Sequence, residues 1–247
     1  MKRKPDIAKI IVCALVITAA VAAVSAATVF GARGYMMYRD AVGERSLEQR
    51  IEDVRSKENF TSYDELPQFY IDAVICTEDK RFETHNGIDP IAIARAAAID
   101  LLTRSFVEGG STITQQVAKN LLFDGEKRLE RKAAEVFAAF ALERCCTKDE
   151  IFELYVNIIC FGSGYYCVYD AAEGYFGCAP AELNRYESAM LAGLPQAPSV
   201  YSPDSNLELA QRRTAAVLQR MVACDKITEQ QALQIIDEGS DALAQAA

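Results

Sequence analysis

The sequence lacks the signatures of several common functional classes. It has one histidine, His85, and no Cys-x-x-Cys pair, which argues against a structural zinc site. No Ser-x-x-Lys, Gly-x-Ser-x-Gly or Walker-type phosphate loop occurs, so it does not carry the motif of a penicillin-type serine transpeptidase. The formal net charge is −9 at pH 7, whereas a general nucleic-acid binder needs a basic surface. We therefore expect no metal site and no nucleic-acid partner.

The N-terminus combines a basic tail, residues 1–9, with an uncharged apolar run, residues 10–30. A helix of this length can cross a hydrocarbon core roughly 30 Å thick. By the positive-inside rule, the basic tail predicts a cytoplasmic N-terminus and an extracytoplasmic remainder. The tail residues concerned are Lys2, Arg3, Lys4 and Lys9. A cleaved signal peptide, cut within residues 22–27, is the alternative, but the apolar run is longer than a signal sequence needs. We therefore expect a single-pass protein of the cytoplasmic membrane.

The rest of the sequence predicts a polar stalk over residues 31–60 and a mostly helical domain over residues 61–247. No alternating strand pattern, repeat or low-complexity tract appears in the domain. Proline and capping-box patterns mark the expected helix starts. These starts lie at Pro67, Asp89-Pro90, Thr147, Asn184 and Thr228. Residues 194–203 predict a loop, and residues 204–247 predict C-terminal helices. Most cysteines lie in apolar or helical segments and are interpreted mainly as small buried residues.

Glu135 is the only charged residue in the apolar segment 133–142. A helix that is apolar on all sides is normally buried, so this carboxylate is expected inside the domain or at a cleft wall. Arg131 and Lys132 lie one turn earlier and can offset the cost of burying it. A catalytic acid and a purely structural ion pair remain equally open on this evidence.

Two further segments combine reactive or anion-binding side chains. Glu78 and Asp79 follow an apolar helical run. Acidic residues at the C-terminus of a helix interact unfavourably with the helix dipole. Local sequence choices that are unfavourable in this way tend to occur at functional sites. A solvated acidic turn is the simpler alternative. Residues 109–120 begin with two glycines and several hydroxyl residues at a helix start, which can bind an anion. Five nearby cations favour a phosphate-bearing ligand over an ordinary turn. They are Lys119, Lys127, Arg128, Arg131 and Lys132.

In order along the chain, these segments resemble the signatures of the family 51 glycosyltransferases. The first is Glu-Asp-x-x-Phe-x-x-His-x-Gly at 78–87, and the second runs from Gly-Ser-Thr-Ile-Thr-Gln-Gln to Lys-Asn at 110–120. The third is Arg-Lys-x-x-Glu at 131–135, and the fourth is Lys-x-x-Ile-x-Glu-x-Tyr-x-Asn at 148–157. The fifth combines residues 171–176 with Glu-x-Ala-x-Leu-Ala-Gly-Leu-Pro at 187–195. The resemblance covers a motif core of residues 66–203, and the sequence resembles the monofunctional biosynthetic transglycosylases of peptidoglycan synthesis.

The resemblance implies a mostly helical, lysozyme-like fold of two lobes, the smaller one near the membrane. It also implies polymerisation of lipid II into glycan strands, with inversion at C1 and release of undecaprenyl diphosphate. Glu78 would act as general base on the acceptor hydroxyl. Glu135, with Arg131 and Lys132, would assist the departing diphosphate.

The remaining residues expected to bind substrate also come from the family motifs. They are Asp79, Phe82, His85, Ser111, Thr112, Gln116, Lys119, Asn120 and Arg128. No cofactor is required, although a divalent cation could assist at the diphosphate. The expected partners are lipid II, the growing strand, the cytoplasmic membrane and other cell-wall synthesis proteins.

Two positions depart from the family pattern, and two other functions remain open. Cys167 stands where glycine is usual and Cys178 where lysine is usual, which puts local substrate contacts in doubt. A lysozyme-like enzyme that cleaves glycan would also use paired carboxylates. The basic and Gly-Ser-Thr motifs favour synthesis, because cleavage leaves no diphosphate to hold. An inactive membrane-anchored scaffold is the third possibility, and the intact Glu78 and Glu135 argue against it.

Overall fold

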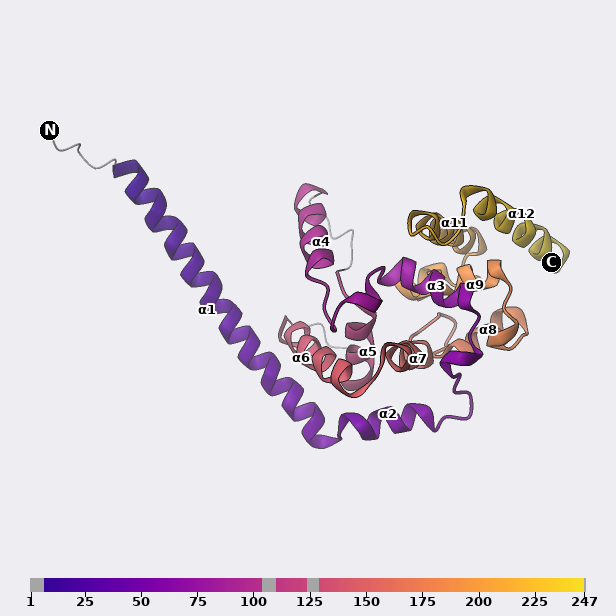
Figure 1. The fold of residues 1–247 in the computed structure, drawn as a ribbon, viewed down its shortest axis with the longest axis horizontal. Coiled ribbons are helices and arrows are strands. Elements are labelled where there is room, and N and C mark those ends of the chain that lie inside the picture. Colours follow the sequence, from indigo (N-terminus) through magenta and orange to yellow (C-terminus); the bar gives the residue numbers. More distant parts are fainter. Residues whose placement is uncertain (1–6, 104–109, 124–128, 247) are drawn as a thin grey trace.

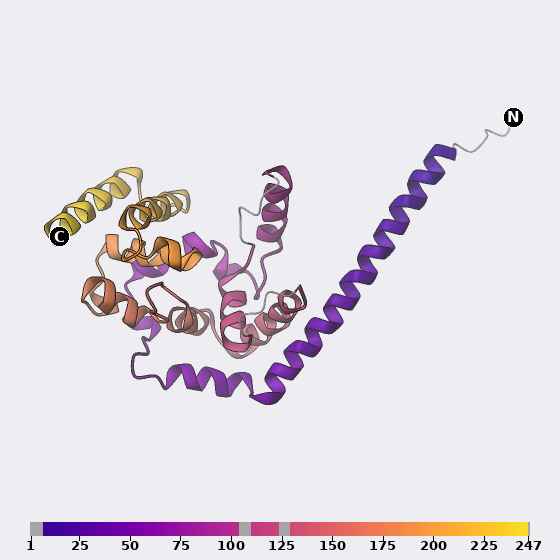
Figure 2. The same ribbon diagram turned by 180° about the vertical axis from the view of Figure 1, so that it is seen from behind.

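The chain begins with one long apolar helix that projects away from the rest of the molecule (Figures 1 and 2). The computed structural model describes residues 7–103, 110–123 and 129–246, and this helix, α1 (Ile7–Glu44), has 38 residues. Among the described helices it alone is long and apolar enough to cross a membrane. At 1.5 Å per residue it is about 57 Å long, so it extends well beyond a hydrocarbon core roughly 30 Å thick.

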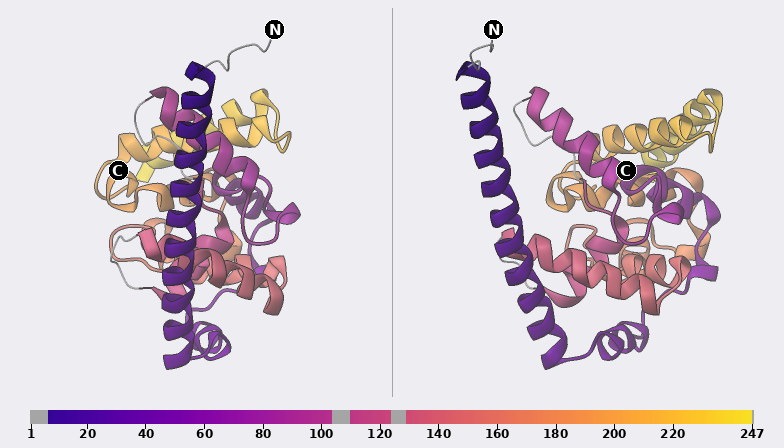
Figure 3. Two further views of the ribbon diagram at one scale, coloured as in Figure 1. Left: turned by 90° about the vertical axis from the view of Figure 1, so that its left-hand side faces the viewer. Right: turned by 60° about the vertical axis from the view of Figure 1, so that its left-hand side comes forward.

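The second half of α1 is packed against the domain. It lies along α6 (Leu129–Cys145), as Figure 3 shows. Gly34 permits this close approach, because a Cβ there would lie 2.5 Å from Ala133 Cβ. The Tyr35 and Phe137 rings meet edge to face, with centroids 5.2 Å apart. The polar stalk expected over residues 31–60 is therefore helical, because this part of α1 has packing partners on the domain and α2 (Leu47–Arg55) follows it.

The remaining helices begin largely where the sequence predicted. Thr147 and Asn184 form the predicted capping boxes, and Asp89 Oδ1 accepts hydrogen bonds from two backbone N–H groups of the next helix. The described helices are, in order, η1 (Tyr63–Glu65), α3 (Gln68–Glu78), η2 (Phe82–Thr84), α4 (Pro90–Thr103), α5 (Ile113–Leu122), α6, α7 (Lys148–Ile158), α8 (Val168–Phe176), η3 (Pro180–Glu182), α9 (Arg185–Gly193), η4 (Leu194–Gln196), α10 (Pro198–Tyr201), α11 (Leu207–Ala223) and α12 (Glu229–Ala246).

Residues 194–203 are not the open loop that the sequence predicted. They form η4 and α10, each of which has proline within its first two residues. Proline suits the first helical turn because its missing N–H would have no partner there. Among the described residues no β-strand occurs beyond a single bridge between Gly162 and Tyr165, so the predicted mostly helical fold is confirmed.

The domain consists of two packed groups of helices. In the first group, α5 packs against α6 and α7, and α6 packs against α1. In the second group, α3, α9 and α11 pack on one another and α12 covers α9 and α11. Tyr155 and Phe152 of α7 are fully buried within the shared core. The apolar helix α4 extends from the domain on the side towards which the N-terminal end of α1 points (Figures 1 and 3).

The cysteines differ from their predicted role as mainly buried residues. All eight are free, and of the seven outside the apolar run only Cys76 and Cys167 are buried. Cys146, Cys178 and Cys224 are partly buried and pack against the core, whereas Cys145, at the end of α6, is exposed and the prediction is wrong for it. Cys167 has a specific role as the N-cap of α8, accepting a hydrogen bond from the Asp170 backbone N–H at 3.4 Å.

Candidate active site

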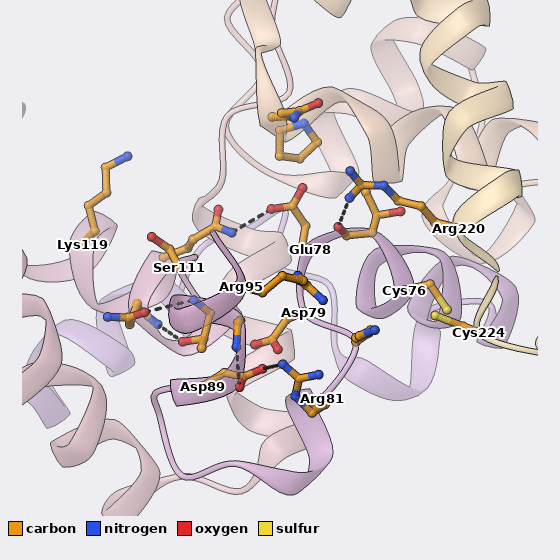
Figure 4. Close-up of a pocket in the computed structure, with 18 of the residues that line it drawn as sticks. Cys76, Glu78, Asp79, Arg81, Asp89, Arg95, Ser111, Lys119, Arg220 and Cys224 are labelled. Carbon is orange, nitrogen blue, oxygen red and sulfur yellow. Dashed lines mark hydrogen bonds and ion pairs between the residues drawn. The ribbon is translucent and has the colours of Figure 1, made fainter. Parts of the chain in front are cut away.

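A polar cleft of about 580 Å³ lies between the two helix groups. Its walls come from the end of α3, the loop that follows, α4, the start of α5, α6, residues 195–196 and α11. Figure 4 shows Glu78 and Asp79 in the middle of this space, with Ser111 and Lys119 to one side and Arg220 to the other. Carboxylates, hydroxyls and cations line the cleft together, so it suits a ligand that carries hydroxyl groups and negative charge.

Glu78 is the last residue of α3 and is partly exposed in the cleft. Gln116 of α5 donates from Nε2 to Glu78 Oε2 at 2.8 Å. Enclosure by protein raises the pKa of the Glu78 carboxyl, while the Gln116 hydrogen bond and the charges of Arg213 and Arg220 act to lower it. A carboxylate with a raised pKa and a neutral hydrogen-bond partner is suited to accept a proton.

Asp79 connects the end of α3 to the start of α5. Its Oδ2 accepts hydrogen bonds from His85 Nε2 at 2.8 Å and from the Ile113 backbone N–H at 3.0 Å. Phe82, between them in sequence, is only 1% exposed and lies in the core, with Lys148 Nζ 4.6 Å from its ring centroid. In this structure Asp79, Phe82 and His85 contact the protein itself, and their expected contacts with substrate stay predictions.

Thr112 builds the start of α5. Its hydroxyl accepts a hydrogen bond from the Gln115 backbone N–H at 3.1 Å and donates to the Gly87 carbonyl at 2.7 Å. Gly87 has a φ of +90°, which favours glycine. Ser111, one residue earlier, lines the cleft and accepts a hydrogen bond from Lys132 Nζ at 2.6 Å. Ser111 is therefore available to a ligand, whereas the Thr112 hydroxyl is already engaged by the fold.

Glu135 lies on α6 in the surroundings that the sequence predicted. It is 2% exposed and belongs to the lining of the cleft. Lys132 Nζ lies 2.8 Å from its Oε2, and Arg131 Nε lies 3.2 Å from its Oε1. The Lys132 side chain is 51% exposed, so its ammonium faces both Glu135 and the open cleft. The arrangement can place a cation against a negatively charged ligand while the carboxylate behind it stays paired.

The other predicted phosphate-binding residues are not all in one place. Lys119 lines the cleft and, in Figure 4, extends away from the acidic residues. Asn120 is the next residue along α5 and faces a different, smaller cavity, which Arg45, Lys57 and other residues line. Arg128 lies outside the described residues. The roles expected for Lys119, Asn120 and Arg128 stay predictions.

The cleft also contains arginines that the sequence reasoning missed. Arg81 pairs with the buried Asp89 at 2.6 Å and fixes the loop after α3, while Arg95 lines the cleft from α4. Arg213 and Arg220 of α11 line its other wall. Arg213 follows the rule that identified Glu135, a charge on the apolar face of a helix, and its sequence setting could have revealed it.

No metal-binding cluster appears among residues 7–103, 110–123 and 129–246. No three His, Cys, Asp or Glu side chains there are placed to hold a metal ion together. Neither the absence of a required cofactor nor the assistance of a divalent cation is tested by this observation. Both stay predictions.

Comparison with known proteins gives one matching family and a set of longer relatives. The family model described as Transglycosylase matches residues 44–222. Penicillin-binding protein 1A of Aquifex aeolicus (strain VF5) is 46% identical over 175 residues, which are 71% of this chain and 24% of that protein. Penicillin-binding protein 1A of Escherichia coli (strain K12) is 45% identical over 168 residues, 68% of this chain and 20% of that protein.

The chain thus spans about a quarter or less of the length of these relatives. Among solved structures, the crystal structure of penicillin-binding protein 1A from Haemophilus influenzae is similar, with 28% identity and a TM-score of 0.35. That match covers 51% of this chain and 16% of the other.

Proposed function

This chain belongs to the transglycosylase family, and we propose that it is a peptidoglycan glycosyltransferase that polymerises lipid II into glycan strands. The family 51 resemblance predicted from the motifs is confirmed by this membership, which also agrees with the expected mostly helical, lysozyme-like domain. Neither the glycan-cleaving alternative nor the inactive scaffold is favoured by the comparisons.

The observation that carries the proposal is the difference between the two carboxylates of the cleft. Glu78 has a neutral amide as its direct partner, 2.8 Å away, whereas two cations lie within 3.2 Å of Glu135. Carboxyl groups in contrasting surroundings take different chemical roles. Glu78 is therefore the proton acceptor, and the Glu135 group is the place where developing negative charge is stabilised.

The proposed reaction follows from these roles. Glu78 accepts the proton of the acceptor's 4-hydroxyl as that oxygen attacks C1 of the growing strand. The bond from C1 to the lipid diphosphate breaks with inversion at C1. Lys132 and Arg131 stabilise the charge that develops on the departing diphosphate, and Glu135 orients both cations. Ser111 and Lys119 are placed in the same cleft to contact phosphate oxygens.

We also propose that α1 anchors the domain on the outer face of the cytoplasmic membrane. The basic tail before α1 supports a cytoplasmic N-terminus. The exposed isoleucines Ile91 and Ile93 of α4 support contact with lipid, because α4 extends towards the side to which α1 points (Figure 1). Binding of other cell-wall synthesis proteins remains an expectation.

The decisive experiment incubates the purified full chain in detergent with labelled lipid II and, in a parallel sample, with preformed labelled glycan. Polymer is the expected product, whereas cleavage of preformed glycan would indicate the lytic alternative and no product at all the scaffold. Glu78→Gln should lower the rate about 10²–10⁴-fold, because an amide cannot accept the proton. Glu83→Gln is the matched control, since Glu83 is exposed and lies in the same loop region. A Glu78→Gln variant that polymerises at the wild-type rate refutes the assignment of the base.

A further inference from the structure

Two arginines outside the family motifs face the catalytic cleft from α11. Arg213 and Arg220 are seven residues apart, two helical turns, and therefore lie on the same face of the helix. Both line the cleft that contains Glu78. α11 packs against α3, the helix that ends at Glu78. The sequence reasoning assigned no role to either arginine.

Arg220 holds the end of α3 directly. Its Nη1 donates a hydrogen bond to the Thr77 carbonyl at 2.5 Å, as Figure 4 shows. Thr77 immediately precedes Glu78, and the last carbonyls of a helix have no partner within the helix itself. A cation at this position also interacts favourably with the helix dipole. The contact therefore fixes the backbone from which the Glu78 side chain extends.

Arg213 carries its charge in a buried position, where desolvation is energetically unfavourable. It is 7% exposed, its Nε donates to the Gly193 carbonyl at 3.0 Å, and its guanidinium lies 5.6 Å from the Tyr201 ring centroid. Burial and the nearby Arg220 lower the pKa of Arg213, and the charge of Glu78 opposes them. In the described part of the chain neither arginine has a carboxylate oxygen within 4.0 Å. Buried charges without a close partner are rare, so the position of Arg213 needs a reason.

The surroundings of Glu78 supply that reason. Gln116 of α5 gives it one hydrogen bond, while the buried Tyr155 of α7 gives it no charge, and Asp79 beside it is a like charge. Among the described residues, the main positive charges acting on the Glu78 carboxylate are therefore Arg213 and Arg220 of α11. On the basis of the proposed function, we propose that Arg213 and Arg220 are positioning residues for the general base. They orient the end of α3 and keep the Glu78 carboxylate ionised at neutral pH.

The test compares the pH dependence of kcat/KM for lipid II polymerisation by the full chain and its variants. A general base works only when deprotonated, so activity falls as the pH drops through the pKa of Glu78. Arg220→Gln removes a cation that lowers this pKa and should move the acidic limb to higher pH. Activity should recover towards the wild-type value above the shifted limb. Arg220→Lys keeps the charge and a donor, and should restore the wild-type profile.

Arg212→Gln is the matched control on the same helix. The Arg212 side chain is 72% exposed and pairs with Glu208, so its loss should leave the pH profile unchanged. An Arg220→Gln variant with a wild-type profile, or with an equal loss of activity at every pH, overturns the proposal. Arg213→Gln should move the acidic limb in the same direction as Arg220→Gln, and thermal melting accompanies each assay to show that every variant is folded.

A measurement that does not depend on enzymatic activity can test this proposal independently of the proposed function. The pKa of Glu78 is measured by NMR titration of side-chain carboxyl carbons in the ¹³C-glutamate-labelled full chain, with Glu78→Gln to assign the resonance. Arg220→Gln should raise this pKa even if the wild-type chain makes no polymer. An unchanged pKa refutes the positioning role, whereas inactive wild-type protein with the expected shift refutes only the glycosyltransferase assignment.

Discussion

Replacing Lys132 with alanine separates a catalytic role of the Glu135 cluster from a purely structural one. Lys132 Nζ contacts Glu135 Oε2 at 2.8 Å and Ser111 Oγ at 2.6 Å, and its side chain is 51% exposed. Glu135 itself is 2% exposed, but it retains Arg131, whose Nε lies 3.2 Å from Oε1. The substitution therefore does not leave a buried charge without a partner.

These contacts set the expected change in stability. Removing the only partner of a buried charge costs roughly 3–5 kcal/mol, whereas an exposed ion pair contributes about 0–1 kcal/mol. Because Arg131 remains and Lys132 is half exposed, we expect Lys132→Ala to lower the free energy of unfolding by about 1 kcal/mol. For a domain of this size that corresponds to a fall in Tm of about 3 °C.

The expected change in activity is much larger. A cation that meets charge developing on the diphosphate contributes only in the transition state, and loss of such a group costs about 10²–10³-fold in kcat. Glu135→Gln should lose a similar amount. Because Lys132 and Glu135 act as one unit, the double variant should be little slower than the slower single variant.

Thermal melts and lipid II polymerisation assays on the three variants measure both quantities. Arg144→Ala is the control, since Arg144 is an exposed cation on the same helix but outside the cleft lining. The reasoning is refuted if Lys132→Ala melts more than about 10 °C earlier yet polymerises near the wild-type rate below its melting temperature. Glu135 and Lys132 would then form a structural ion pair.

Two further predictions concern the fold and the topology. Asp79→Ala should lower the free energy of unfolding by about 1–3 kcal/mol, because His85 Nε2 and the Ile113 N–H both contact Asp79 Oδ2 and would lose their shared buried acceptor. Chemical denaturation measures this loss, and the exposed Asp64→Ala is the control; equal stabilities of the two variants would contradict it. Protease added to intact spheroplasts should digest the chain after Gly31, and a domain that stays protected until the membrane is broken would refute the proposed orientation.

Local sequence patterns predicted most of the helix starts and the ion pairs of Glu135. Thr147 and Asn184 mark helix starts because a capping box is formed by residues three positions apart. The ion pairs of Glu135 were equally predictable, since Arg131 and Lys132 precede it by four and three residues and share its side of α6. In both cases the contacting groups belong to one helical turn, so their separation along the sequence determines how close they lie in the folded helix.

The sequence did not predict contacts between distant helices. The part of α1 that falls in the expected stalk packs on α6, and the fit at Gly34 depends on Ala133, which is 99 residues later in the chain. Arg220 contacts Thr77 across 143 residues, and nothing near either position indicates the other. A motif places residues along the chain, but only the packing of α11 on α3 brings this arginine to the base.

Glu78 and Glu135 would respond differently to relative movement of the two helix groups, because their partners come from different helices. The cations that pair with Glu135 come from its own helix, so they move with it. Glu78 takes its hydrogen bond from Gln116, on α5 of the first helix group, and positive charge from Arg220, on α11 of the second. Because α3 belongs to the second group, a displacement of one group relative to the other would change the distance from Glu78 to Gln116 and leave Arg220 in place. Loss of the Gln116 hydrogen bond would raise the pKa of Glu78, whereas the ion pairs of Glu135 would stay intact.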